Sequence, residues 1–121
     1  MEIEISDNSL RKALEDDRKR VRKFGPDIAA KIAIRMTSLL AAKTLADLWP
    51  PFKLPERCHE LKGTRKGVFS IDLKHPFRLL FRPINTESNP ERPDSDSAAD
   101  EQERWKNIRE IEVIGIEDTH A

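Results

Sequence analysis

Two arginines lie on the same face of one predicted strand of this chain. In the β-rich run 77–82, alternation places Arg78 and Arg82 on the face opposite the two phenylalanine rings. Arg65 and Lys66 lie shortly before, in a loop bounded by glycines. Guanidinium groups on a rigid strand can hold a phosphate and stabilise the charge that builds during phosphoryl transfer. From spacing alone, the favoured interpretation is that these cations are solvated surface residues with carboxylate partners.

The three histidines offer proton transfer. Histidine titrates near neutrality and can move the protons needed to cleave RNA without a metal ion. His59 opens the segment Cys-His-Glu-Leu-Lys-Gly, His75 occupies a predicted turn between two strands, and His120 is the penultimate residue. Taken alone, His75 is interpreted as a turn residue and His120 as part of a tail.

The segment 18–23 is strongly basic, with five cations in six residues. A solvated helix face is the favoured interpretation, and contact with a phosphate backbone is the alternative. The lone Cys58 excludes an internal disulfide and a CxxC zinc site. The sequence has no Walker loop, GxGxxG, HExxH, GxSxG or EF-hand pattern, so we expect no metal and no cofactor. It also has no tyrosine, which disfavours an RNA-stacking sheet of the RRM type.

The elements that must position these residues fall into separate blocks. Residues 2–5 alternate as a short strand, and apolar spacing predicts a two-helix hairpin over about 8–43. Strands are predicted at 68–73 and 77–82, joined as a hairpin, and again at 108–116. This order predicts an α+β fold with the helices packed on one face of an antiparallel sheet.

The hairpin strands predict one core face and one polar face. Alternation assigns the core face to Phe69, Ile71, Leu73, Phe77, Leu79 and Phe81. It turns Ser70 and Asp72 away from the core, together with Leu80 and the two arginines. The candidate chemistry should therefore lie on the side of the sheet away from the helices.

The charges of this chain are divided between a basic N-terminal part and a later acidic segment. The chain has 121 residues, which fits one domain, 1–121. Residues 1–85 carry 18 Lys and Arg against 11 Asp and Glu, and residues 86–103 carry seven acids against one arginine. The polar, acidic segment at about 84–104 lacks an apolar period and is predicted to be a disordered or loosely helical insertion. With no apolar run long enough for a membrane span and no secretory signal, we expect a cytoplasmic protein.

The ordered segments resemble a known family. Residues 58–73 (CHELKGTRKGVFSIDL), residues 77–81 (FRLLF) and the ending Asp-Thr-His at 118–120 are similar to the HigB branch of the RelE/ParE toxin superfamily. These are the "killer protein" toxins of bacterial type II toxin–antitoxin modules. The resemblance covers roughly residues 1–83 and 105–121. Its most specific part is the HxLKG…SI…(aromatic)R core combined with the terminal DxH.

The resemblance implies a RelE-like fold and ribosome-dependent cleavage of messenger RNA. It also implies a helix-turn-helix, HigA-like antitoxin as partner, with operator DNA contacted only through the antitoxin complex. By position, the catalytic residues of the family correspond to His59, Arg78, Asp118 and His120. Thr119 departs from the tyrosine usual in this branch.

The basic residues near this motif are expected to bind RNA. They are Lys62, Arg65, Lys66 and Arg82. The sequence thus predicts a metal-independent endoribonuclease in which a ribose 2′-hydroxyl attacks the adjacent phosphorus. Two alternatives stay open: a ParE-like toxin that binds gyrase, and a catalytically degenerate toxin fold that serves only as a binding module.

Overall fold

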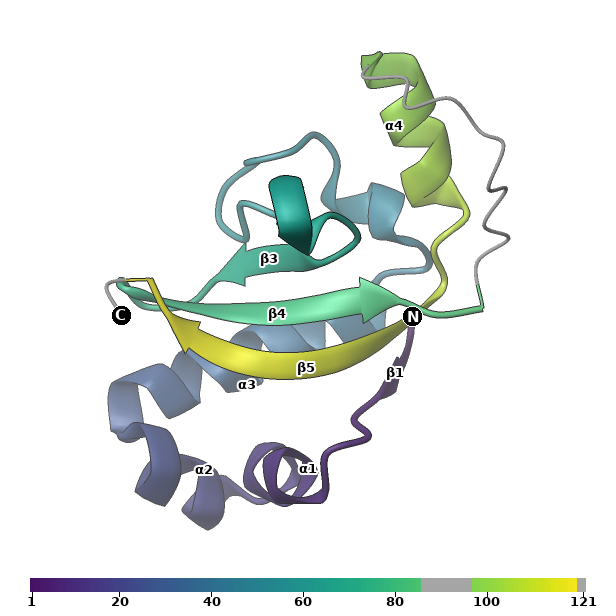
Figure 1. The fold of residues 1–121 in the computed structure, drawn as a ribbon. Helices are drawn as coiled ribbons and strands as arrows, with labels where there is room; N and C mark the ends of the chain where they lie inside the picture. The colour runs from purple at the N-terminus through teal and green to yellow at the C-terminus, as the bar shows by residue number, and fades with distance from the viewer. Residues whose placement is uncertain (86–96, 120–121) are drawn as a thin grey trace.

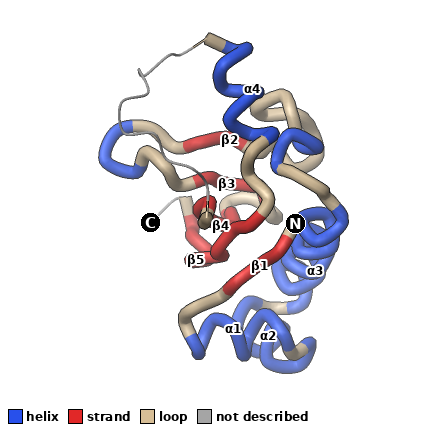
Figure 2. The backbone as a smooth tube through the Cα atoms, turned by 90° about the vertical axis from the view of Figure 1, so that its right-hand side faces the viewer, coloured by secondary structure: helices blue, strands red, loops and turns tan. Residues whose placement is uncertain are grey.

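The computed structural model describes residues 1–85 and 97–119, which fold as helices packed on a five-stranded sheet. The helices are α1 (Asn8–Glu15), α2 (Asp17–Phe24), α3 (Pro26–Ala41) and α4 (Ala98–Lys106), with short 3₁₀ turns η1 (Leu45–Leu48) and η2 (Gly63–Arg65). The strands are β1 (Glu2–Glu4), β2 (His59–Glu60), β3 (Phe69–Asp72), β4 (Phe77–Pro83) and β5 (Glu110–Asp118). The predicted α+β class is confirmed. Two views at right angles show α3 on one side of the sheet and η2 on the other (Figures 1 and 2).

The sheet is mixed rather than antiparallel. Its strand order is β1-β5-β4-β3-β2, and β1 pairs with β5 in parallel, with Glu2 opposite Glu110. The other neighbouring strands are antiparallel. The expectation of an antiparallel sheet is therefore wrong at the β1 edge. A parallel pair needs a long connection, and here nearly the whole chain lies between the two strands. Strand β2, which the sequence analysis did not predict, adds His59 to the opposite edge.

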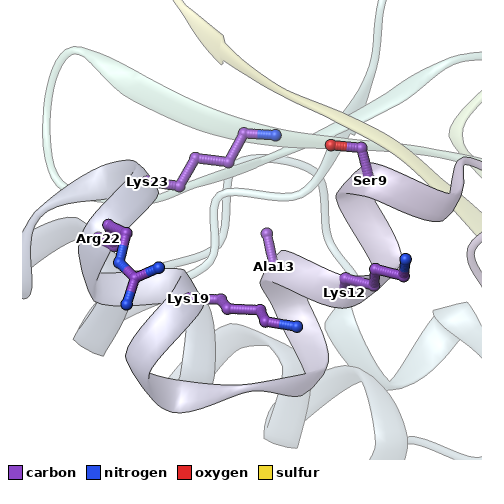
Figure 3. Close-up of a pocket in the computed structure, with 6 residues that line it drawn as sticks. All are labelled: Ser9, Lys12, Ala13, Lys19, Arg22 and Lys23. Atoms are coloured by element: carbon purple, nitrogen blue, oxygen red, sulfur yellow. The ribbon is translucent and has the colours of Figure 1, made fainter.

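The predicted two-helix hairpin is built from three helices. Asp16 has an extended backbone (φ −121°, ψ 122°), which ends α1. Its carboxylate accepts a hydrogen bond from the backbone N–H of Lys19 (2.9 Å) and so caps α2. Gly25, with φ +81°, separates α2 from α3, and Pro26 opens α3. The break at Asp16 sets α1 and α2 at an angle, and basic side chains of both helices project into that angle (Figure 3).

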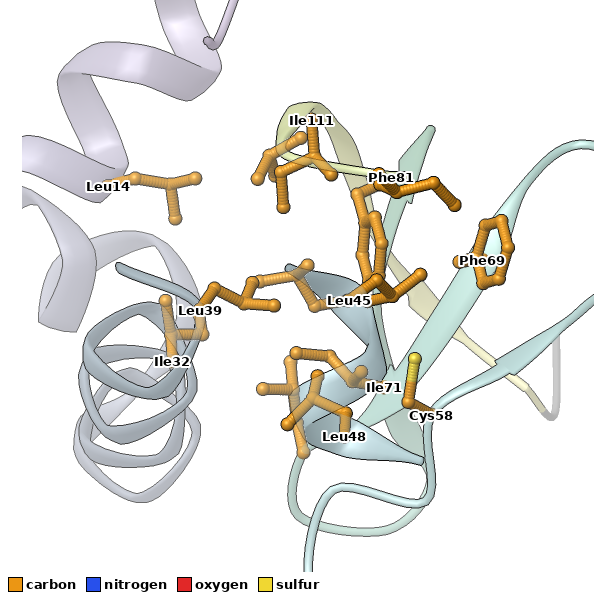
Figure 4. Packing of buried hydrophobic residues seen from close by; sticks show 14 of the residues in the cluster. Leu14, Ile32, Leu39, Leu45, Leu48, Cys58, Phe69, Ile71, Phe81 and Ile111 are labelled. Atoms are coloured by element: carbon orange, nitrogen blue, oxygen red, sulfur yellow. The ribbon is translucent and has the colours of Figure 1, made fainter. Parts of the chain in front are cut away.

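The core lies between α3 and the sheet. It joins apolar residues of α1, α3, η1 and strands β3, β4 and β5 (Figure 4). Its most buried members include Ile32, Leu39, Leu45, Ile71, Leu79, Phe81 and Ile111. The predicted core face of the hairpin is confirmed. The second face is less open than predicted, because Ser70 is fully buried and Leu80 is only 6% exposed. The turn η2 lies over that side of the sheet, near β3 (Figure 1).

Part of the predicted disordered insertion is a helix. The structure places residues 98–106 in α4, whose cap Ser97 accepts a hydrogen bond from the backbone N–H of Asp100. Trp105 anchors the helix: it is fully buried, with its ring 5.0 Å from that of Trp49 and 5.7 Å from that of Phe69. Of the two predicted alternatives, the helical one holds for the part of the insertion after residue 96, and disorder is wrong there, because the buried Trp105 anchors the helix without an apolar stripe. Residues 86–96 lie outside the described part of the chain.

Candidate active site

Four strands bring charged and aromatic residues to the side of the sheet away from α3. In register, His59 on β2 lies opposite Ser70 on β3, Asp72 lies opposite Arg78 on β4, and Arg78 lies opposite Glu117 on β5. Residues two apart on a strand share a face, so these side chains occupy one face. The strand spacing places His59 and Arg78 roughly 12 Å apart between Cα atoms. At this separation His59 and Arg78 would act together by contacting the same bound substrate and not each other.

Arg78, Arg65 and Glu117 form the centre of this site. The Arg78 guanidinium donates to one Glu117 oxygen from Nε (2.8 Å) and lies 2.6 Å from it through Nη2. Arg65, from η2, donates Nη1 to both oxygens of the same carboxylate (2.9 and 3.1 Å). Burial alone would raise the pKa of Glu117, but the hydrogen bonds and charges of Arg65 and Arg78 outweigh it and lower that pKa. Glu117 is thus held as a carboxylate between two arginines.

A β-bulge turns Glu117 toward this face. Leu80 lies opposite Gly115 but Phe81 lies opposite Val113, so Ile114 is an extra residue in β5. In a regular strand, every second residue after the buried Ile111 would face the core, and Glu117 would be one of them. The extra residue shifts this alternation by one position. Ile116 therefore packs against the core, and Glu117 faces outward beside Arg78. Alternation alone could not have found Glu117. Gly115, an isolated glycine within the strand, is a local sign of a bulge, but it does not show where the extra residue lies.

A second ion pair borders the first. Arg57 donates Nη1 to Asp72 Oδ2 (3.1 Å). The backbone of Asp72 is held from the other side, because the buried Arg35 of α3 donates Nε to the Asp72 carbonyl (2.7 Å). Asp72 is the cross-strand neighbour of Arg78. The carboxylates of Asp72 and Glu117 therefore flank Arg78 on both sides.

His59 is fixed in one orientation. Its Nδ1 lies 2.8 Å from the carbonyl oxygen of Arg57, and its ring stacks on Phe52 with centroids 4.1 Å apart. A carbonyl can only accept, so Nδ1 carries a proton and Nε2 of the neutral ring keeps a lone pair. The flanking residues Phe52 (φ +64°) and Arg57 (φ +49°) both adopt left-handed backbone conformations. Such strain is concentrated at functional sites in proteins.

The predicted RNA-binding residues divide between two places. Lys62, Arg65 and Lys66 belong to η2 or flank it, next to the site, with Lys62 and Lys66 exposed. Arg82 lies elsewhere on the same strand face, four residues beyond Arg78. It donates Nε and Nη2 to one oxygen of Glu112 (2.9 and 2.7 Å). Arg82 is therefore not brought to the centre formed by Arg65 and Arg78.

The predicted C-terminal residues are only partly described. Asp118 lies opposite Phe77 and follows Glu117, so strand alternation puts it on the other face from Glu117. Thr119 ties the end of β5 to the neighbouring turn, since its hydroxyl donates to the Pro76 carbonyl (2.8 Å). His120 lies outside the described residues. Glu117, the neighbour of Asp118 in the chain, is a carboxylate that contacts Arg78.

A metal site and a membrane span are both absent from the described residues. In that part of the chain no group of three or more His, Cys, Asp or Glu side chains is arranged to hold a metal ion. Nor does any of its helices combine the length and apolarity needed to cross a lipid bilayer. In comparisons with known proteins, no family model, no curated protein and no solved structure matches this chain. The features that bear on function are therefore the site and the motif residues themselves.

Proposed function

We propose that this protein is the toxin of a type II toxin–antitoxin module, with a RelE-like fold of the HigB branch. It would cleave messenger RNA on the ribosome, in the cytoplasm, and be neutralised by a helix-turn-helix antitoxin. The observation that carries the proposal is the convergence of Arg65 and Arg78 on one carboxylate, with the oriented His59 on the same sheet face. The HxLKG motif that suggested the family contributes His59 and leads directly into the loop of Arg65.

The proposed reaction is attack of a ribose 2′-oxygen on the adjacent phosphorus. The 2′-hydroxyl proton passes to a base, the new O2′–P bond forms, the P–O5′ bond breaks and the departing O5′ takes up a proton. The products are a 2′,3′-cyclic phosphate and a 5′-hydroxyl. Arg65 and Arg78 would bind the phosphate and stabilise the charge of the pentacoordinate state.

His59 is suited to one of the proton transfers. With Nδ1 held by the Arg57 carbonyl, Nε2 is the nitrogen available to accept a proton. The second transfer is assigned to His120 by the family resemblance. Among the carboxylates, the register favours Glu117 over Asp118, because Glu117 already contacts both arginines.

One observation favours a second candidate function. Glu117 engages both arginines, so a phosphate must compete with this carboxylate for them. If that competition is too strong, the fold would serve as a catalytically degenerate binding module that only joins an antitoxin complex. The two functions differ in whether a phosphate can replace Glu117 at Arg65 and Arg78.

The test uses purified ribosomes programmed with a defined message. With the full chain added, we expect cleavage that leaves 5′-hydroxyl ends, mapped by primer extension. A matched message with a single 2′-deoxynucleotide at the mapped position should resist cleavage there, because the nucleophile is missing. Expression of the chain alone should also arrest growth of a bacterial host.

Other outcomes point to the alternatives. Cleavage of the 2′-deoxy message at the same position would refute the 2′-hydroxyl mechanism. Growth arrest with intact messages and inhibited supercoiling by gyrase would indicate a ParE-like toxin. Antitoxin binding with neither activity would indicate the degenerate binding module.

A further inference from the structure

A basic groove lies between α1 and α2, apart from the candidate active site. Its volume is about 320 Å³, and it is lined by Ser9, Lys12, Ala13, Lys19, Arg22 and Lys23 (Figure 3). Figures 1 and 2 place these helices at the end of the molecule opposite α4. We refer to this feature as the α1/α2 groove.

The cations of the groove are gathered by helix geometry. Lys19, Arg22 and Lys23 stand three and four residues apart on α2, so they share one face. Lys12 joins them from α1, because the break at Asp16 folds the two helices toward each other. Lys19, Arg22 and Lys23 of the basic segment 18–23 are exposed, as a solvated helix face requires. The structure also groups these three cations with a fourth from the neighbouring helix.

Two carboxylates near this cluster have partners of their own. Asp16 is used as the cap of α2, and Asp17 pairs with Arg20. Arg20 itself turns back to donate to the Leu14 carbonyl (2.6 Å), so it does not line the groove. Among the residues that the structure describes, the groove lining contains four cationic side chains and no carboxylate. Such like charges repel, and a bound anion would relieve that repulsion.

The lining indicates the chemical class of the anion. A lysine–arginine cluster with a serine hydroxyl matches phosphate oxygens, which accept several hydrogen bonds at once. An acidic protein segment would ordinarily add apolar anchors to its charged contacts. The groove offers Ala13 as its one apolar side chain among the lining residues. A run of backbone phosphates needs no such anchor.

We propose that the α1/α2 groove binds the phosphate backbone of RNA, without sequence preference, as a second contact distinct from the Arg65–Arg78 site. The proposal does not depend on cleavage at the sheet face. A single-stranded RNA that cannot be cleaved should bind there as well.

The test measures binding of a fluorescent 12-nucleotide 2′-O-methyl RNA, which lacks the attacking hydroxyl. The double variant Lys19→Ala/Arg22→Ala removes two groove cations that are both exposed. At about 50 mM salt its affinity should fall roughly tenfold or more, and the slope of log K against log salt should decrease by about 1.4. Circular dichroism should show an unchanged fold.

The matched control is Lys43→Ala/Lys106→Ala, which removes the same charge from two exposed lysines outside the groove. It should change the affinity less than threefold. Equal losses in the two double variants would overturn the proposal, because net charge alone would then explain the binding. Equally tight binding of a poly-glutamate peptide to the intact groove would also overturn it, since the groove would then be an acidic-protein site.

Discussion

Two arginine–glutamate pairs cross from β4 to β5 on the same face of the sheet, and their surroundings differ. At one end Arg82 pairs with Glu112, whose side chain is 10% exposed while that of Arg82 is 57% exposed. At the other end Arg78 pairs with Glu117, and here the arginine is the more covered partner, at 21% against 33%. Glu112 also accepts hydrogen bonds from Ser6, whereas Glu117 accepts them from a second arginine, Arg65.

This difference separates an ion pair with a structural role from one that can bind a ligand. Glu112 and Arg82 balance in charge, and the carboxylate is the buried member. Arg65, Arg78 and Glu117 together carry one surplus positive charge on a face that also holds His59. Phosphate can bind the second group at a lower cost than the first, because two arginines there share a single carboxylate. An arginine on this strand face is therefore not evidence of a site by itself.

The largest expected effect comes from removing each arginine in turn. Arg78→Ala should reduce cleavage of ribosome-bound message at least about a hundredfold, since it removes a transition-state contact. Arg82→Ala, its control on the same strand, should change cleavage less than about threefold. The measurement is the single-turnover cleavage rate, with thermal unfolding of both variants as a check on folding. Equal losses of rate would show that the two pairs do not differ in function.

The same comparison shows what the sequence could and could not predict. Alternation placed Arg78 and Arg82 on one face and Leu79 and Phe81 on the other, because β4 is regular. Glu117 was missed because the bulge at Ile114 reverses the alternation in β5. A bulge depends on how two strands pair, and that information is not local to either strand.

The helix α4 was predicted only as an alternative to disorder, for a related reason. Its acidic sequence has no apolar period, and its stability comes from Trp105 packing on Trp49 and Phe69, which are 56 and 36 residues away in sequence. The break at Asp16 was equally hidden, since an aspartate inside a helical pattern can be a surface residue or a cap. The fold class was predictable from local patterns. The residues that complete the site and the α1/α2 groove depend on tertiary contacts.

A smaller effect is expected from removing the negative charge of each glutamate. Glu117→Gln should raise the affinity for the 2′-O-methyl RNA about two- to fivefold, because both arginines lose a charged competitor that is partly exposed. Glu112→Gln should leave that affinity unchanged, since Arg82 lies outside the site. Fluorescence anisotropy at fixed salt measures both. A decrease in affinity in Glu117→Gln would show that Glu117 positions the arginines for RNA rather than competing with it.

The smallest effect concerns acid stability, where the two pairs should behave alike in sign. The pKa of Glu112 is lowered by hydrogen bonds from Ser6 and Arg82, and that of Glu117 is lowered because its arginine contacts outweigh the effect of burial. A carboxyl with a lowered pKa in the folded state stabilises the fold above its ordinary pKa of 4.5, and that stabilisation is lost as the pH falls through the lowered value.

Between pH 6 and pH 3 the melting temperature of each glutamine variant should therefore fall less than that of the wild type. The two falls should differ by at most a few degrees, which is roughly what one partly exposed ion pair contributes. We expect the pH dependence of the melting temperature to flatten more in Glu112→Gln than in Glu117→Gln. The Glu112 carboxylate is the less exposed of the two and so is less screened by water. Melting curves across this pH range decide the order of the two variants. A larger flattening in Glu117→Gln would mean that the two-arginine site contributes more to stability than the buried pair, which would reverse the division between structural and ligand-binding pairs.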